Sequence, residues 1–193
     1  MLALLAACQS IVQDVLIEPR PETSYVPQSR ISKLPPTKIG VSEFQETNKL
    51  EGTRRRIGER TAFGNQFMGY VWISPTPARI LSDLIRSVLV AGGHQINAET
   101  PSARIDGTVA HFEVSTYATL LYWDVNGKLE TVVNVTTSTN KISRQYAAVC
   151  SERTFIWPGT ELITRVVASC LSDIARQFAD DSSVSDVLSG RTQ

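Results

Sequence analysis

Two stretches of the chain carry apolar residues at the spacing of an amphipathic α-helix. The first is Pro77–Ala91, where a proline opens the first turn and Gly92-Gly93 follows the last one. The second is Glu161–Phe178, with Thr160 as the expected N-cap and one more turn expected over Val184–Leu188. Each helix has one wide apolar face, which predicts that both lie on a sheet. The apolar positions are Ile80, Leu81, Leu84, Ile85, Val88 and Leu89, then Ile163, Val166, Val167, Cys170, Ile174 and Phe178.

Alternation of apolar and polar residues predicts strands in most of the remaining chain. A change of phase near Ala110–His111 predicts a β-bulge, and Asn126-Gly127 between two alternating runs predicts a hairpin turn. Glu46–Arg60 reads as a charged loop, and Thr61–Ile73 as a loop or hairpin that leads into a short strand. The expected strands are Lys38–Phe44, Tyr70–Ile73, His94–Ala98, Ala103–Thr119, Leu121–Val125, Leu129–Thr139 and Lys141–Ile156.

The order of these elements predicts an α+β fold, with one mostly antiparallel sheet and two amphipathic helices packed on one face. The domain is expected over residues 38–188, followed by a polar tail at 189–193. Residues 8–37 are rich in proline and polar side chains, so we expect a tether that extends up to about 80–90 Å. Leu16, Ile17 and Ile31 are the tether residues that could still pack against the domain.

The first seven residues are apolar and stop at Cys8. Residues 1–7 match the end of a secretory signal but lack its basic start, so either the initiator lies upstream or the run is an apolar N-terminus with an ordinary cysteine. Leu5-Ala6-Ala7-Cys8 resembles the lipobox of bacterial lipoproteins. This resemblance implies a lipid anchor on Cys8, and Gln9 in the next position implies the periplasmic face of the outer membrane.

Composition narrows the classes of function. Lysine plus arginine and aspartate plus glutamate number 19 each, which removes the electrostatic basis for binding nucleic acid. The two histidines and the cysteines have no zinc spacing, and no glycine-rich phosphate loop is present, so we expect neither metal nor cofactor. His94 and His111 are the only histidines that could act as a base, and neither lies in a catalytic motif. A carboxylate pair among Asp106, Glu113, Asp124 and Glu130 is the other catalytic alternative, and we expect that the protein is not an enzyme.

Cys150 and Cys170 form a candidate disulfide if the protein is exported to an oxidising compartment. The alternation of Ala147, Val149 and Phe155 points these residues to one face and Cys150 to the other. Cys170 lies on the apolar stripe of the last helix. This arrangement favours two separate buried thiols over a bridge.

Basic and aromatic residues provide a candidate surface for a partner. They are Arg54, Arg55, Arg56, Phe67, Tyr70, Trp72, Tyr122 and Trp123. A solvated loop and core packing are the alternative uses of these residues. The partner would be a protein of the cell envelope or a lipid, and the oligomeric state is left open.

The chain as a whole resembles the YajG-type family of enterobacterial lipoproteins. The similar features are the lipobox, Gly93-His-Gln-Ile after the first helix, Arg144-Gln-Tyr146 in the last strand, and Phe178-Ala-Asp-Asp-Ser-Ser-Val184. The resemblance implies a non-catalytic lipoprotein that binds or scaffolds an envelope partner. The insert Arg54–Trp72 and the edge Leu121–Asp124 depart from the family and leave two alternatives. These are an auxiliary lipoprotein of a lipid or ABC-type transport system with an apolar groove, and a subunit of a ring-forming assembly.

Overall fold

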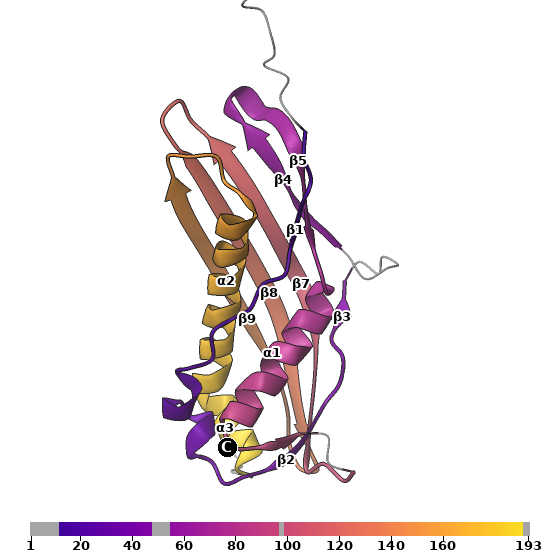
Figure 1. Cartoon of the computed structure of the whole chain (residues 1–193). Coiled ribbons are helices and arrows are strands. Elements are labelled where there is room, and N and C mark those ends of the chain that lie inside the picture. The colour runs from indigo at the N-terminus through magenta and orange to yellow at the C-terminus, as the bar shows by residue number, and fades with distance from the viewer. Residues whose placement is uncertain (1–11, 48–54, 97–98, 191–193) are drawn as a thin grey trace, which may run out of the picture.

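The computed structural model describes residues 12–47, 55–96 and 99–190. It consists of one twisted sheet with helices packed on one face (Figure 1). The α+β prediction is confirmed. Cys8 and Arg54 lie outside the described residues.

Three long antiparallel strands form the centre of the sheet. Strand β7 (Ala103–Ala118) pairs along its whole length with β8 (Trp123–Thr137), and β8 pairs with β9 (Lys141–Thr154). The predicted bulge is confirmed, because the β7–β8 register shifts between Val109 and His111. These strands give the sheet its antiparallel character.

The other edge of β7 pairs in turn with three shorter strands that run parallel to it. They are β2 (Lys38–Val41), β3 (Gln45–Glu46) and β4 (Arg55–Ala62). The predicted loop over Glu46–Arg60 is therefore wrong from Arg55 onward. Strand β4 turns through Phe63–Asn65 into the antiparallel strand β5 (Gln66–Ile73), which confirms the hairpin alternative for this region. Strand β5 also pairs with the parallel strand β1 (Val15–Ile17), and β6 (Gln95–Ile96) pairs with β2.

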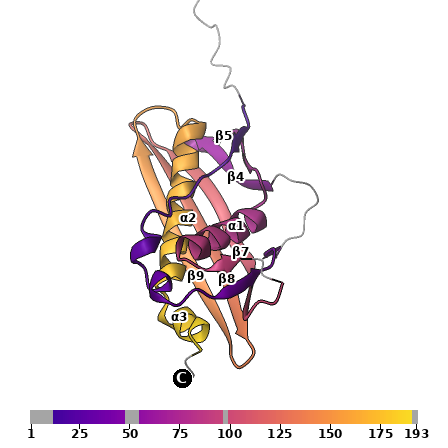
Figure 2. The same ribbon diagram turned by 60° about the horizontal axis from the view of Figure 1, so that its bottom comes forward.

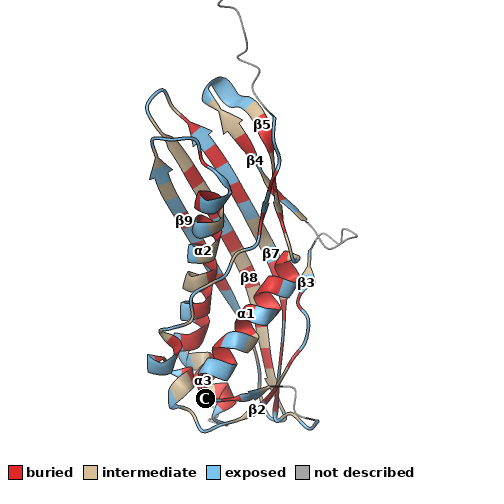
Figure 3. Cartoon of the chain, viewed as in Figure 1, coloured by how far each residue is buried: buried red, intermediate tan, exposed pale blue. Residues whose placement is uncertain are grey.

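Helices α1 and α2 cover one face of the sheet (Figure 2). Helix α1 spans Pro77–Ala91 as predicted, and its N-cap Thr76 accepts a hydrogen bond from the backbone of Arg79. Helix α2 spans Thr160–Asp180, with Gly159 and not Thr160 as its N-cap. A short helix α3, Ser182–Leu188, follows. The buried residues gather where the helices meet the sheet (Figure 3). The residues that alternate with them along the three long strands, such as Arg104, Lys128 and Gln145, are exposed and polar.

The hairpin predicted at Asn126-Gly127 is wrong, because both residues lie inside β8 and pair on both sides. The turn lies earlier, at Thr119–Tyr122, where the Thr119 hydroxyl accepts hydrogen bonds from the backbone of Leu121 and Tyr122. Gly127 instead allows close packing between β8 and α2. A Cβ there would meet Val166 Cγ1 at 3.3 Å and Cys170 Sγ at 3.4 Å, so glycine allows α2 to lie close to the strand.

The extended tether predicted over residues 8–37 is wrong from Val12 onward, because this segment packs along the domain. Ile17, Val26 and Ile31 are completely buried. The backbone N–H of Glu22 donates to Ser172 Oγ at 2.9 Å, on α2. The prolines interrupt regular structure, as expected, but the apolar residues between them have enough buried surface to hold the segment in place.

Candidate functional site

The outer face of β4 and β5 carries a row of large side chains. Val71 and Ile73 are completely buried in the core, so the alternating Tyr70 and Trp72 lie on the opposite face of the sheet. The Tyr70 ring lies 4.8 Å from that of Phe67 and 6.4 Å from that of Trp72. Arg56 extends from β4 over Tyr70, with its Cζ 4.8 Å from the ring centre. We call Arg56, Phe67, Tyr70 and Trp72 the aromatic row.

Asp14, at the start of the β1 edge, holds this row in position. Its carboxylate accepts hydrogen bonds from the backbone N–H of Tyr70 at 2.8 Å and from Trp72 Nε1 at 2.9 Å. These two hydrogen bonds lower the pKa of Asp14, since both stabilise the ionised form. A surface cleft lined by Asp14, Val15, Leu16 and Trp72 continues the row.

Arg55 does not belong to the predicted surface. Its side chain is largely buried and its Nε donates to Glu46 Oε2 at 2.7 Å. The other oxygen of Glu46 accepts from the backbone of Ala78, in the first turn of α1. Arg55 therefore helps to join β3 and β4 to the start of α1.

Tyr122 and Trp123 form a second group at the turn between β7 and β8. Arg153 lies over the Tyr122 ring at 3.7 Å and forms an ion pair with Asp124, with 2.7 Å between Nε and Oδ1. The ring of Trp123 packs at 4.8 Å against that of Trp157, in the connection to α2. The structure thus divides the residues predicted as one surface between two places.

Arg60 is a residue that the sequence analysis missed. It lies on β4, is 2% exposed, and stacks on Trp157 with its Cζ 4.7 Å from the ring centre. Its guanidinium donates to the carbonyls of Gln13 and Pro158 at 2.9 and 3.2 Å. Burial lowers the pKa of Arg60, although an arginine stays charged in proteins. Nothing in the pattern around this arginine distinguishes it from a solvated one.

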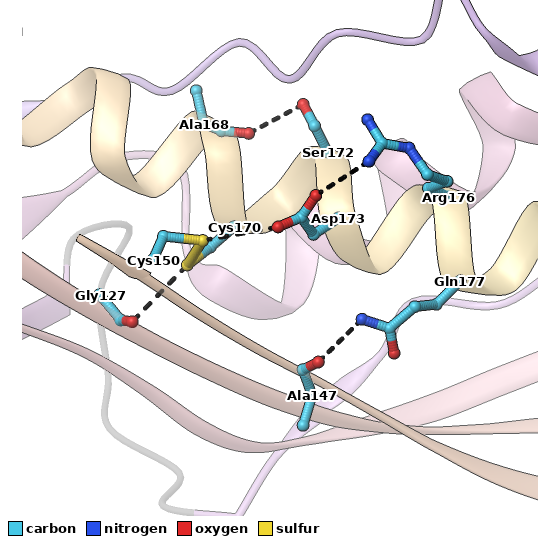
Figure 4. Close-up of a disulfide and its surroundings, with 9 residues drawn as sticks. All are labelled: Gly127, Ala147, Cys150, Ala168, Cys170, Ser172, Asp173, Arg176 and Gln177. Carbon is cyan, nitrogen blue, oxygen red and sulfur yellow. Dashed lines mark hydrogen bonds and ion pairs between the residues drawn. A yellow bond between two sulfur atoms is a disulfide. The ribbon is translucent and has the colours of Figure 1, made fainter. Parts of the chain in front are cut away.

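Cys150 and Cys170 are joined by a disulfide that links β9 to α2 (Figure 4). The two Cα atoms lie 5.6 Å apart. The expectation of separate thiols is wrong because the inward face of β9 was misassigned. Tyr146, Ala148 and Cys150 face the helix, and Val149 and Phe155 are exposed.

Neither histidine lies in a catalytic arrangement among the described residues. His94 is buried. Its Nδ1 accepts a hydrogen bond from the backbone N–H of Thr37, and its Nε2 lies 3.2 Å from the carbonyl oxygen of Ile31. Both ring nitrogens therefore already have a partner. His111 faces solvent beside Glu113, at 2.8 Å. Among the described residues no three His, Cys, Asp or Glu side chains form a metal-binding group.

The candidate carboxylates each have a partner of their own. Asp106 accepts from Asn134 at 2.7 Å, Asp124 pairs with Arg153, and Glu130 lies 3.0 Å from Lys128. These contacts satisfy carboxylates on an open sheet, which is the ordinary state of such residues. They do not form a pair poised for glycoside hydrolysis.

The apolar groove expected for lipid transport is also not evident. Of five surface clefts formed by the described residues, none is lined by Tyr122 or Trp123. The space between sheet and helices is filled by completely buried side chains such as Ile85, Leu129 and Ile163.

A family profile described as "uncharacterized lipoprotein" matches residues 55–189, well over half of the chain. The protein belongs to this lipoprotein family. The match agrees with the resemblance to YajG-type lipoproteins. No curated protein matches the lipoprotein. None of the helices formed by its described residues combines the length and the apolar character needed to cross a membrane.

The fold of the lipoprotein recurs in protein XCC0632 of Xanthomonas campestris, with 12% identity and a TM-score of 0.62 over 92% of this chain and 99% of that one. A minor lipoprotein of Acinetobacter baumannii is less similar, with 13% identity and a TM-score of 0.44 over 80% and 94%. Lipoprotein GNA1162 of Neisseria meningitidis gives 13% and 0.33 over 72% and 99%.

Proposed function

We propose that this lipoprotein is a non-catalytic scaffold, anchored through a lipid on Cys8 to the periplasmic face of the outer membrane, that binds a protein partner of the cell envelope through the aromatic row. The aromatic row is the observation that carries the partner. Tyrosine, tryptophan and arginine are the residues that most often dominate binding energy at protein interfaces. Here they stand together, partly exposed, on an open sheet face.

The row is also rigid before a partner arrives. Asp14 fixes Trp72 and the β5 backbone, and Arg56 lies on Tyr70. Ordering a long side chain on binding costs roughly 0.5–1.5 kcal/mol, and a preformed row avoids part of this cost. This pre-organisation supports the proposed binding role.

The anchor is tested by metabolic labelling with a radioactive fatty acid. The wild-type chain should incorporate the label and fractionate with outer membranes, because the acyl chains supply the attachment. Cys8→Ser should lose both the label and the membrane fraction. An unlabelled wild-type chain would contradict the proposed anchor.

The partner surface is tested by a photoreactive amino acid in place of Tyr70, compared with one in place of Gln145, an exposed residue of β9. Position 70 should crosslink to one defined envelope protein, and Arg56→Ala should weaken this crosslink because it removes a neighbouring contact. Position 145 should not crosslink to that protein. Equal crosslinking from both positions would contradict a role of the aromatic row.

A further inference from the structure

Three connections at one end of the molecule expose large apolar side chains. They are the β4–β5 turn, the β7–β8 turn and the segment between β9 and α2, and all lie at the upper end in Figure 1. Leu120 and Leu121 are 82% and 78% exposed, and Phe155 and Ile156 are 79% and 76% exposed. Phe63 on the β4–β5 turn is also exposed. We call these five residues the apolar tip.

Contacts between the connections hold the apolar tip together. The rings of Trp123 and Trp157 join the β7–β8 turn to the segment before α2. Thr61 donates its backbone N–H to Thr116 Oγ1 at 2.9 Å and its hydroxyl to the Thr116 carbonyl, which joins the β4–β5 turn to the end of β7. The tip is therefore a supported surface made of three segments.

The apolar tip contains no ionisable acid or base that would resist entry into lipid. Residues 61–67, 115–123 and 154–160 include no Asp, Glu, Lys, Arg or His, although 20% of the chain is charged. Tyr122 and Trp123 directly follow Leu121 in the sequence, and Trp157 directly follows Ile156. Arg153 lies over the Tyr122 ring. Tryptophan and tyrosine behind an apolar apex are typical of the boundary between lipid and water.

The opposite end of the molecule has a different character. A cleft there, between the N-terminal segment and the C-terminal helices, is lined by Arg30, Lys33, Asp180 and Asp186 among other residues. The polarity of the molecule therefore changes along its length, from the apolar tip to a charged end.

The chain enters the fold at the same end as the apolar tip. The backbone N–H of Gln13 donates to the Met68 carbonyl at 3.0 Å, and its carbonyl accepts from Arg60. Five Cα–Cα steps separate Cys8 from Gln13, and they span at most about 18 Å. A lipid on Cys8 would thus hold this end of the domain close to the bilayer surface.

We propose that the apolar tip inserts into the interfacial layer of the same phospholipid leaflet that holds the Cys8 lipid. This inference rests on the proposed anchor. The exposed leucines, phenylalanines and isoleucine enter the acyl boundary, and the tryptophans and Arg153 lie at the level of the headgroups. The tip gives the domain a second attachment and a fixed orientation, with α3 directed away from the membrane.

The test uses a chain with an N-terminal hexahistidine in place of residues 1–8, bound to vesicles of phosphatidylethanolamine and phosphatidylglycerol that contain a nickel-chelating lipid. Trp72→Phe removes one of the three tryptophans, so that Trp123 and Trp157 report from the tip. Insertion should shift the tryptophan emission to shorter wavelength, because the indoles enter a less polar environment. Lipids brominated near the carbonyl should in addition quench this emission. Leu120→Asp with Leu121→Asp should abolish the quenching.

The control is Val149→Asp, which alters a residue that is 76% exposed on β9, outside the tip. This variant should keep the quenching. In vesicles without the nickel lipid, changing either tip leucine to aspartate should weaken binding about tenfold or more. The reason is that the apolar surface of that leucine is no longer buried in the membrane.

Three results would overturn the proposal. The first is an absence of quenching in the tethered wild-type chain, and the second is an equal loss of quenching in Val149→Asp. The third is a dimer in free solution that Leu120→Asp dissociates, since the tip would then be an interface between copies. In these experiments the nickel lipid replaces the lipid on Cys8 as the anchor. Their outcome therefore does not depend on whether Cys8 is acylated, and the labelling experiment tests that acylation by itself.

Discussion

Arg60 lies flat over Trp157, with its guanidinium carbon 4.7 Å from the ring centre. The same guanidinium donates to the carbonyl of Gln13, where the chain enters the fold, and to that of Pro158, just before α2. One buried cation therefore ties β4 to two segments that are distant in sequence. We therefore expect the stability of this end of the molecule to depend on Arg60.

We expect Arg60→Ala to lower the free energy of unfolding by about 2–4 kcal/mol, because the buried carbonyl of Pro158 and the partly buried carbonyl of Gln13 lose a charged donor, and Trp157 loses its stacking partner. Urea denaturation measures the change. Arg79→Ala, on the exposed side of α1, is the matched control and should change the value by about 0.5 kcal/mol or less. If both substitutions changed the free energy of unfolding equally, the contacts of Arg60 would not contribute to stability more than those of a surface arginine.

Replacing both Cys150 and Cys170 by alanine should lower the free energy of unfolding by about 3 kcal/mol, because the bridge closes a loop with a sequence separation of 20 residues. Dithiothreitol should lower the stability of the wild-type chain by a similar amount and leave the double variant unchanged. A wild-type chain that is insensitive to reductant would contradict a structural role for the bridge.

Gly127→Ala should destabilise the protein by about 1–3 kcal/mol, since the added Cβ presses on Val166 and on the disulfide. Val166→Ala opens space at the same place. In combination the two changes should cost less than the sum of the single changes, which a double-mutant cycle in urea measures. Strict additivity would show that the packing of α2 on Gly127 is not tight.

His94 should make stability depend on pH. Burial lowers its pKa below the ordinary 6.5, with the hydrogen bond to Ile31 acting in the opposite direction. The unfolded chain therefore binds the proton more readily, and the free energy of unfolding should fall as the pH decreases through 6.5. His94→Gln should remove this part of the pH dependence in urea titrations at several pH values.

Arg79→Ala, on the exposed side of α1, is the control for that experiment. It should keep the wild-type pH dependence, because an arginine stays charged throughout this pH range. An unchanged slope in His94→Gln would contradict the assignment.

Local patterns predicted those elements that local interactions determine. Helix α1 was predicted at its observed bounds, since its apolar period, proline start and glycine end all agree. The bulge after Val109 was visible as a change of phase. For helix α1 and for this bulge, the pattern within a single segment of the sequence is enough to predict the structure.

Predictions failed where a distant segment decides the structure. Asn126-Gly127 has the composition of a turn, but its glycine is needed for the approach of α2. Which face of β9 is buried also depends on α2. Tyr146 and Cys150 point toward this helix, whereas Val149 is exposed. The lone Arg60 gave no signal, because its three contacts come from other parts of the chain.

The N-terminal segment has a consequence for when the protein can fold. Glu22 and Arg30 form their backbone hydrogen bonds with Ser172 and Asp180, side chains of the last long helix. Residues 22–30 thus have no docking place until the last long helix has been made. Such a chain completes its structure only late in synthesis, after Asp180 has been added.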